Sequence, residues 1–94
     1  MLLRKLYTNG QILIPKKITQ TLGIENGFPL YIYIIDDVII IEQDNEDKHL
    51  NQTMLSNGNI TIPSELRKLL KLDSGSLLKM EVNTDNKIYL RKTS

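Results

Sequence analysis

Asn9-Gly10-Gln11-Ile12-Leu13-Ile14-Pro15 returns later in the chain as Asn57-Gly58-Asn59-Ile60-Thr61-Ile62-Pro63. The similarity continues at the same spacing through Leu22/Leu70, Gly27/Gly75 and Leu30/Leu78. One additional residue in the second half then shifts the register, so that Asp36 aligns with Asp85 and Ile39 with Ile88. The pattern indicates an internal duplication. A unit of fewer than about 50 residues is close to the lower limit for burying a core alone, so we expect the two copies to share one core.

Composition restricts the chain to one small globular unit. It has 94 residues, of which 40% are hydrophobic and 24% charged, and its net charge of +1 does not by itself indicate nucleic acid. Cysteine is absent from the sequence, which excludes disulfides, thiolate nucleophiles and cysteine zinc sites. The longest apolar runs, Leu30–Ile35 and Val38–Ile41, are too short to span a bilayer, and the start lacks the order of a secretion signal. We therefore expect a cytoplasmic protein with no membrane partner.

Each copy has the pattern of two strands, a short helix and two more strands. In the first copy we expect a strand over Leu2–Thr8, an Asn9-Gly10 turn, a short strand with Ile12 and Ile14 pointing inward, a helix from Pro15 to Gly23, and a hairpin of Phe28–Ile35 and Val38–Gln43 around Asp36-Asp37. In the second copy the same order covers Asn51–Ser56, Asn59–Ile62, a helix over Ser64–Leu70, Leu77–Asn83 and Lys87–Lys92. The predicted organisation is repeat one over 1–43, an acidic linker over 44–49 and repeat two over 50–94.

These residues resemble a known DNA-binding domain. The matching positions are Arg4-Lys5, Gly10, Ile12, Ile14-Pro15 and Thr21-Leu22-Gly23-Ile24, followed by a hydrophobic hairpin. Together they resemble the AbrB/SpoVT/MazE family, in which two chains interleave their hairpins into one swapped-hairpin barrel. The resemblance implies a mainly β, AbrB-like barrel in which two ββαββ repeats, with two short helices, form a single-chain pseudo-dimer. MraZ-type regulators also carry two such units per chain.

The resemblance also implies where DNA would be contacted. The basic pair of the first strand is Arg4-Lys5, and our alignment places Gln52-Thr53 there in the second repeat. The helical pair is missing from the first repeat and present as Arg67-Lys68 in the second. If the hairpins interleave, these two pairs form one charged surface of lowered symmetry. We therefore expect a DNA-binding face that is more basic at one end.

Four further residues extend this prediction. The residue after the turn glycine, usually arginine in the family, is Gln11 or Asn59, and either amide can read an adenine edge. Lys16-Lys17 add charge at the start of the first helix. The candidate DNA-binding residues are Arg4, Lys5, Gln11, Lys16, Lys17, Asn59, Arg67 and Lys68.

Simpler interpretations of the same residues stay open. Each basic residue is also explained as a solvated surface charge, both Asn-Gly turns are required by the hairpins, and Gln11 and Asn59 are equally explained as solvated. Four tyrosines could form a stacking platform for single strands, but their apolar surroundings favour packing in the core or at the barrel rim: Tyr7, Tyr31, Tyr33 and Tyr89. His49 is the single histidine, so no metal site is expected. The sequence contains no nucleophile–base pattern, phosphate loop or cofactor fingerprint, so neither an enzyme nor a cofactor is expected.

The sequence therefore predicts a sequence-preferring, double-stranded DNA-binding transcription regulator of the AbrB-like type. The alternative is a MazE-type antitoxin that acts as a repressor or partner-binding module. Because the chain ends at Ser94 directly after the last predicted strand, a toxin-binding tail and a toxin partner are not expected. A barrel that serves assembly and has lost DNA binding is a third interpretation. Further homodimerisation of the whole chain stays open.

Overall fold

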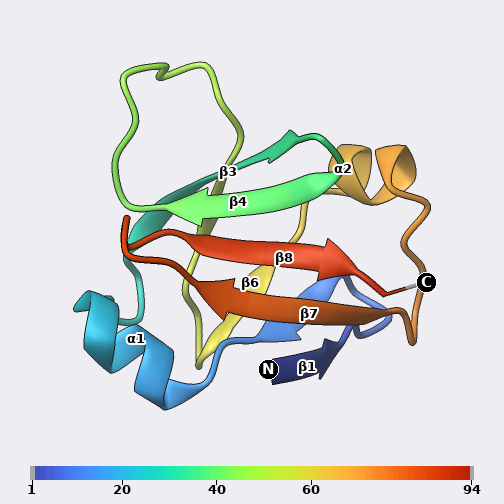
Figure 1. Ribbon diagram of the computed structural model, residues 1–94, viewed down its shortest axis with the longest axis horizontal. Coiled ribbons are helices and arrows are strands. Elements are labelled where there is room, and N and C mark those ends of the chain that lie inside the picture. Colours follow the sequence, from blue (N-terminus) through green and yellow to red (C-terminus); the bar gives the residue numbers. More distant parts are fainter. Residues whose placement is uncertain (1, 94) are drawn as a thin grey trace.

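The computed structural model describes residues 2–93 and consists of a six-stranded and a two-stranded antiparallel sheet with two short helices (Figure 1). The elements are β1 (Leu2–Lys5), β2 (Gln11–Leu13), α1 (Lys16–Leu22), β3 (Pro29–Ile35), β4 (Val38–Glu42), β5 (Gln52–Met54), β6 (Asn59–Thr61), α2 (Ser64–Leu69), β7 (Leu77–Val82) and β8 (Ile88–Lys92). The predicted mainly β fold with two ββαββ halves is confirmed. The predicted limits of the two repeats stay a prediction.

The two halves exchange their first strands. The six-stranded sheet has the order β1-β7-β8-β4-β3-β5, so β1 completes the hairpin of the second half and β5 completes that of the first. The small sheet pairs β2 with β6 and lies behind β7 and β8 in Figure 1. The registers define a pseudo-two-fold axis through the Ile12–Ile60 pair in the small sheet and the Ile40–Tyr89 pair in the large one. This axis relates α1, at the lower left of Figure 1, to α2 at the upper right.

One core lies between the two sheets, and both halves supply it. The large side chains that are almost completely buried are Leu6, Ile12, Leu30, Ile32, Ile39, Ile41, Ile60, Ile62, Leu78, Ile88 and Leu90. Burial of apolar surface contributes about 25 cal/mol per Å². Separating the halves would expose the inner face of each hairpin, so we predict that neither half keeps its core alone. No helix within residues 2–93 is long and apolar enough to cross a membrane.

The two Asn-Gly turns differ in length. Asn57 and Gly58 both have positive φ (51° and 81°), as a two-residue hairpin turn requires. In the Asn9-Gly10 turn only Gly10 has positive φ (81°), and the Tyr7 N–H donates to the Gln11 carbonyl at 2.9 Å. The first turn is therefore one residue longer than the second. An ordinary turn followed by a left-handed glycine is a common way to join strands with a three-residue loop.

This additional residue changes which first-strand positions correspond. Leu6 exchanges backbone hydrogen bonds with the loop between α2 and β7, and Leu55 makes the equivalent bonds with the loop between α1 and β3. Leu6 therefore corresponds to Leu55, and Arg4-Lys5 corresponds to Thr53-Met54. The sequence alignment with Gln52-Thr53 was wrong by one position. Either alignment leaves the second half without a basic pair on this strand.

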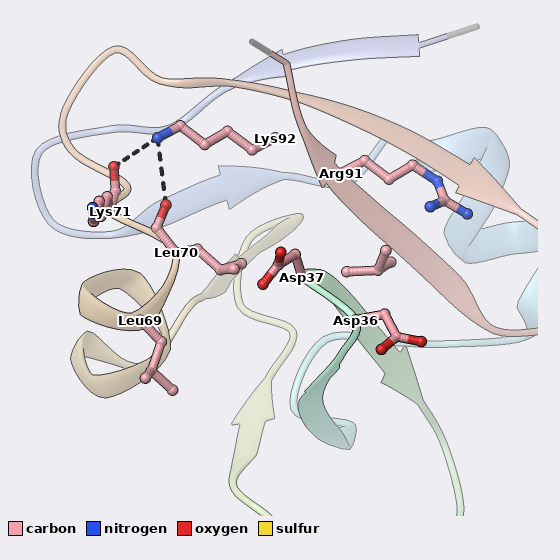
Figure 2. A pocket seen from close by; sticks show the side chains of 8 residues that line it. Asp36, Asp37, Leu69, Leu70, Lys71, Arg91 and Lys92 are labelled. Carbon is pink, nitrogen blue, oxygen red and sulfur yellow. Dashed lines mark hydrogen bonds between the residues drawn. The ribbon is translucent and has the colours of Figure 1, made fainter.

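A residue in the left-handed conformation follows each helix. Gly23 ends α1 at φ 70°, as predicted, whereas Lys71 takes the corresponding place after α2 at φ 55°. The left-handed conformation is costly for Lys71 because it has a side chain. A hydrogen-bonding side chain from β8 supports the chain at this point. Lys92 donates from Nζ to the carbonyl oxygens of Lys71 at 3.0 Å and Leu70 at 3.4 Å, as Figure 2 shows. In the first half Gln43 donates to the last carbonyl of α1 at 2.9 Å.

Candidate nucleic-acid interface

The outer face of the β2–β6 pair carries the two predicted base-reading amides. Ile12 and Ile60 are 0% and 1% exposed and point into the core, so their neighbours in each strand point outward. Gln11, opposite Thr61, lies at one end of this face, and Asn59 lies at the other. Both side chains are half-buried. The pseudo-two-fold axis thus passes between two equivalent amides, which is the arrangement expected of a pseudo-dimer.

The two amides differ in their hydrogen bonding. The Asn59 side chain donates from Nδ2 to the carbonyl oxygen of Asn57 at 3.4 Å, a long bond that holds it against its own turn. The Gln11 side chain makes no hydrogen bond with any residue from 2 to 93, although its backbone N–H donates to Asn9 Oδ1 at 3.1 Å. Gln11 is therefore the freer of the two amides to bind an external group.

Arg67 fastens α2 to the first turn. Its Nε donates to the Ile62 carbonyl oxygen at 2.9 Å, and its guanidinium lies over Gly10. A Cβ at Gly10 would lie 2.6 Å from Arg67 Cζ, so the arginine occupies the space that the glycine leaves. Arg67 is half-buried, whereas the adjacent Lys68 is exposed. The predicted helical pair therefore contains one arginine that holds the turn and one solvent-exposed lysine.

The predicted first-strand pair is also divided. Arg4 lies opposite the buried Leu78, and its Nε is buried without a hydrogen-bond partner in the described part of the chain. Lys5 lies opposite the exposed Leu77 and is itself exposed. A Cβ added at Gly75 would lie 3.9 Å from Lys5 Cε, so the lysine side chain runs beside the loop that follows α2. Successive residues of a strand point to opposite sides, so Arg4 and Lys5 do not present one double charge.

Lys16 and Lys17 occupy the first turn of α1 at the other end of the face. Both are exposed, and the first turn has neither an acidic residue nor a side-chain cap. The helix macrodipole disfavours cations at this end, so the lysines do not stabilise α1. In α2 the charges follow the dipole, with Glu65 in the first turn and basic residues in the last. The unfavourable placement in α1 is what a binding function for these lysines would explain.

The outer face of the large sheet, on the opposite side of the molecule, carries tyrosines. Tyr31, Tyr33 and Tyr89 are half-buried on the outer face of the large sheet, and Tyr7 is 53% exposed, so none of the four tyrosines lies in the core. Burial, followed by a hydrogen bond to the Glu42 carboxylate, raises the pKa of Tyr33 to about 12.

Within residues 2–93 no three His, Cys, Asp or Glu side chains are grouped to hold a metal ion.

A cavity of about 600 Å³ lies beside the C-terminal end of α2 (Figure 2). Asp36 and Asp37 approach it from the β3–β4 turn, and Arg91 and Lys92 from the end of β8. The cavity thus has charges of both signs at its wall, and one of its cations, Lys92, is already hydrogen-bonded to backbone carbonyls. This region therefore lacks the uniform positive charge that a nucleic-acid contact needs.

Comparisons with known proteins bear on the second half of the chain and on the overall fold. Residues 56–94 match the family described as antidote-toxin recognition MazE, bacterial antitoxin. The solution structure of PHS018 from Pyrococcus horikoshii is similar over 99% of this chain and 92% of that chain, with a TM-score of 0.58 and 18% sequence identity. None of the curated proteins matches the chain. The second half is therefore similar to the MazE antitoxin family, and the whole chain shares the fold of PHS018.

Proposed function

We propose that this chain is a sequence-preferring, double-stranded DNA-binding transcription regulator in which the two halves together form one binding unit. The observation that carries the proposal is the outer face of β2–β6. It presents an amide on each side of the pseudo-two-fold axis and has exposed lysines at both ends. Similarity of residues 56–94 to the MazE antitoxin family supports this function.

The eight residues have different roles in the proposal. Exposed lysines supply phosphate contacts, which give affinity without reading sequence: Lys5, Lys16, Lys17 and Lys68. Gln11 and Asn59 contact base edges. The half-buried Arg4 and Arg67 reach phosphate only through their terminal nitrogens. Arg67 additionally keeps the turn before Gln11 in place through its contact with Gly10.

Selection from a random duplex pool tests the proposal, because a DNA-binding protein of this kind enriches a motif. With roughly four to six phosphates neutralised, the slope of log K against log salt should be about −4 to −5. Replacing Lys16 and Lys17 by alanine should flatten it by about 1 to 2 units. Failure to enrich any motif would contradict the proposed function.

A matched control separates local contact from total charge. Lys79 and Arg91 are paired across β7 and β8 on the outer face of the large sheet, away from β2 and β6. Replacing both by alanine removes the same charge as the Lys16/Lys17 variant. The control should leave the slope nearly unchanged. Equal flattening by both variants would show that the lysines of α1 are outside the interface.

A MazE-type antitoxin is the second candidate, favoured by the description of the family that matches residues 56–94. Both candidates contact DNA, and they differ in a second protein ligand. Purification of the tagged chain from its own host distinguishes them. A stoichiometric second protein that leaves the DNA-binding face free would favour the antitoxin, whereas a DNA-binding chain that purifies without a second protein would favour the regulator.

A further inference from the structure

A second cavity of about 610 Å³ lies at the α1 end of the molecule, between the helix and the second turn. Buried or half-buried groups line it, including Ile14, Thr19 and Gly58. Glu25 and Asn26 lie at its edge. The Thr19 hydroxyl already donates to the Lys16 carbonyl oxygen at 3.0 Å, so it does not offer its proton to the cavity.

The pseudo-two-fold axis relates this cavity to the place of Arg67 in the other half. Thr19 corresponds to Arg67, Gly58 to Gly10, and Ile14 to Ile62, by the spacing of the duplicated motifs. In the α2 half the guanidinium covers Gly10, and a Cβ there would lie 2.6 Å from Arg67 Cζ. In the α1 half a Cβ at Gly58 would meet only the tip of Leu13, at 3.5 Å. The short threonine therefore leaves open the space that an arginine fills in the other half.

The backbone carbonyl that Arg67 uses is retained in the open cavity, and a carboxylate lies among the lining residues. The Ile62 carbonyl accepts the Arg67 Nε–H, whereas the Ile14 carbonyl accepts no hydrogen bond from residues 2–93. Glu25 forms no ion pair with any described cation and stands where the other half has Asp73. An unpaired carbonyl and a nearby carboxylate are complementary to a guanidinium.

We propose that this cavity binds an arginine side chain of a partner protein, with the guanidinium plane over Gly58 and an N–H donated to the Ile14 carbonyl. Glu25 balances the charge at the edge, where Lys16 also lies. Lysine is a poor substitute, because its compact ammonium has no plane to cover the glycine. This site goes beyond DNA binding, since the cavity recognises a protein side chain. In the other half of the chain, Arg67 fills the equivalent space.

Titration of the isotopically labelled chain with N-acetyl-L-arginine amide tests the proposal, followed by amide resonances in NMR. The shifts should concentrate at Gly58, Thr19 and Asn26, and N-acetyl-L-lysine amide should bind at least about tenfold more weakly. Thr19→Arg should abolish the response, because its own side chain fills the cavity as Arg67 does. Equal binding of both amides, or shifts spread evenly over the surface, would overturn the proposal.

Glu25→Gln provides a second variant that leaves the fold unstrained, because Glu25 is exposed. It should weaken arginine-amide binding about three- to tenfold and leave the thermal midpoint unchanged. An undiminished response in a folded Thr19→Arg chain, or in Glu25→Gln, would contradict the site. A concentration-dependent dimer that Thr19→Arg abolishes would assign the arginine to a second copy of the chain and overturn the choice of partner.

Discussion

Replacing Gly10 by alanine tests the contact that joins α2 to the first turn, and Gly58→Ala is its matched control. Both glycines have φ +81°. At Gly10 the new Cβ would lie 2.6 Å from Arg67 Cζ and 2.8 Å from its Nε. At Gly58 it would lie 3.5 Å from Leu13 Cδ1, an ordinary van der Waals separation. The two variants therefore share the backbone strain and differ in the clash.

The expected losses of unfolding free energy follow from these geometries. A side chain in the left-handed conformation costs about 1–2 kcal/mol, which is the whole expectation for Gly58→Ala. Gly10→Ala must also displace the guanidinium and lose the Nε bond to the Ile62 carbonyl, 2.9 Å long. A hydrogen bond from a charged group contributes about 1.5–3 kcal/mol, and the lower figure suits the half-buried Arg67. Gly10→Ala should therefore cost about 2.5–3.5 kcal/mol in total.

Urea denaturation with linear extrapolation measures both variants, provided that the m-value stays constant. Arg67→Ala completes a double-mutant cycle, since in that background Gly10→Ala should cost only the strain, about 1–2 kcal/mol. Equal destabilisation by Gly10→Ala and Gly58→Ala would show that the contact between Arg67 and Gly10 does not stabilise the fold. So would an unchanged cost of Gly10→Ala after removal of the Arg67 side chain.

Fragments 1–47 and 48–94 should not fold as monomers, because each exposes half of the core; cooperative melting of a monomeric fragment in calorimetry would contradict the shared core. Stability should fall as pH rises from about 10 to about 12, because the folded pKa of Tyr33 is raised from 10.0 to about 12. Tyr33→Phe should reduce this fall in alkaline denaturation curves, and identical curves would refute the assignment. On a selected operator, alanine at Arg4-Lys5 and alanine at Arg67-Lys68 should weaken overlapping but distinct parts of the footprint, each with at least about tenfold weaker binding. Uniform loss across a perfect palindrome would contradict a lopsided face.

The local parts of the fold could be predicted because short-range chemistry determines them. The glycine turns, the prolines that precede each helix and the alternation around Ile12 and Ile60 all act within a few residues. The correspondence of the first strands could not be predicted from the motif alone. The longer turn before Gly10 moves Leu6 into the place of Leu55, and only the hydrogen bonds between the halves reveal it.

The same distinction, between features set by short-range chemistry and features set by contacts between the halves, applies to the candidate site. Alternation along a strand placed Gln11 and Asn59 outward, and applied to Arg4-Lys5 it would also have separated those two side chains. The contact between Arg67 and Gly10 had no signal in the sequence, because it joins residues of different halves that meet only when the hairpins interleave. Its open counterpart beside Thr19 becomes visible only when the two halves are compared in three dimensions.

Amide shift mapping of the labelled chain with a selected duplex addresses whether both halves read DNA through one face. We predict shifts at both ends of the β2–β6 pair, at Gln11 and Asn59, and at the lysines of α1, with Lys79 and Arg91 on the opposite sheet unaffected. A duplex of scrambled sequence should shift the resonances of the α1 lysines but not those of Gln11 and Asn59, because phosphate contacts do not depend on sequence. Shifts centred on the outer face of β7 and β8, or confined to one half of the chain, would contradict a single DNA-binding unit built from both repeats.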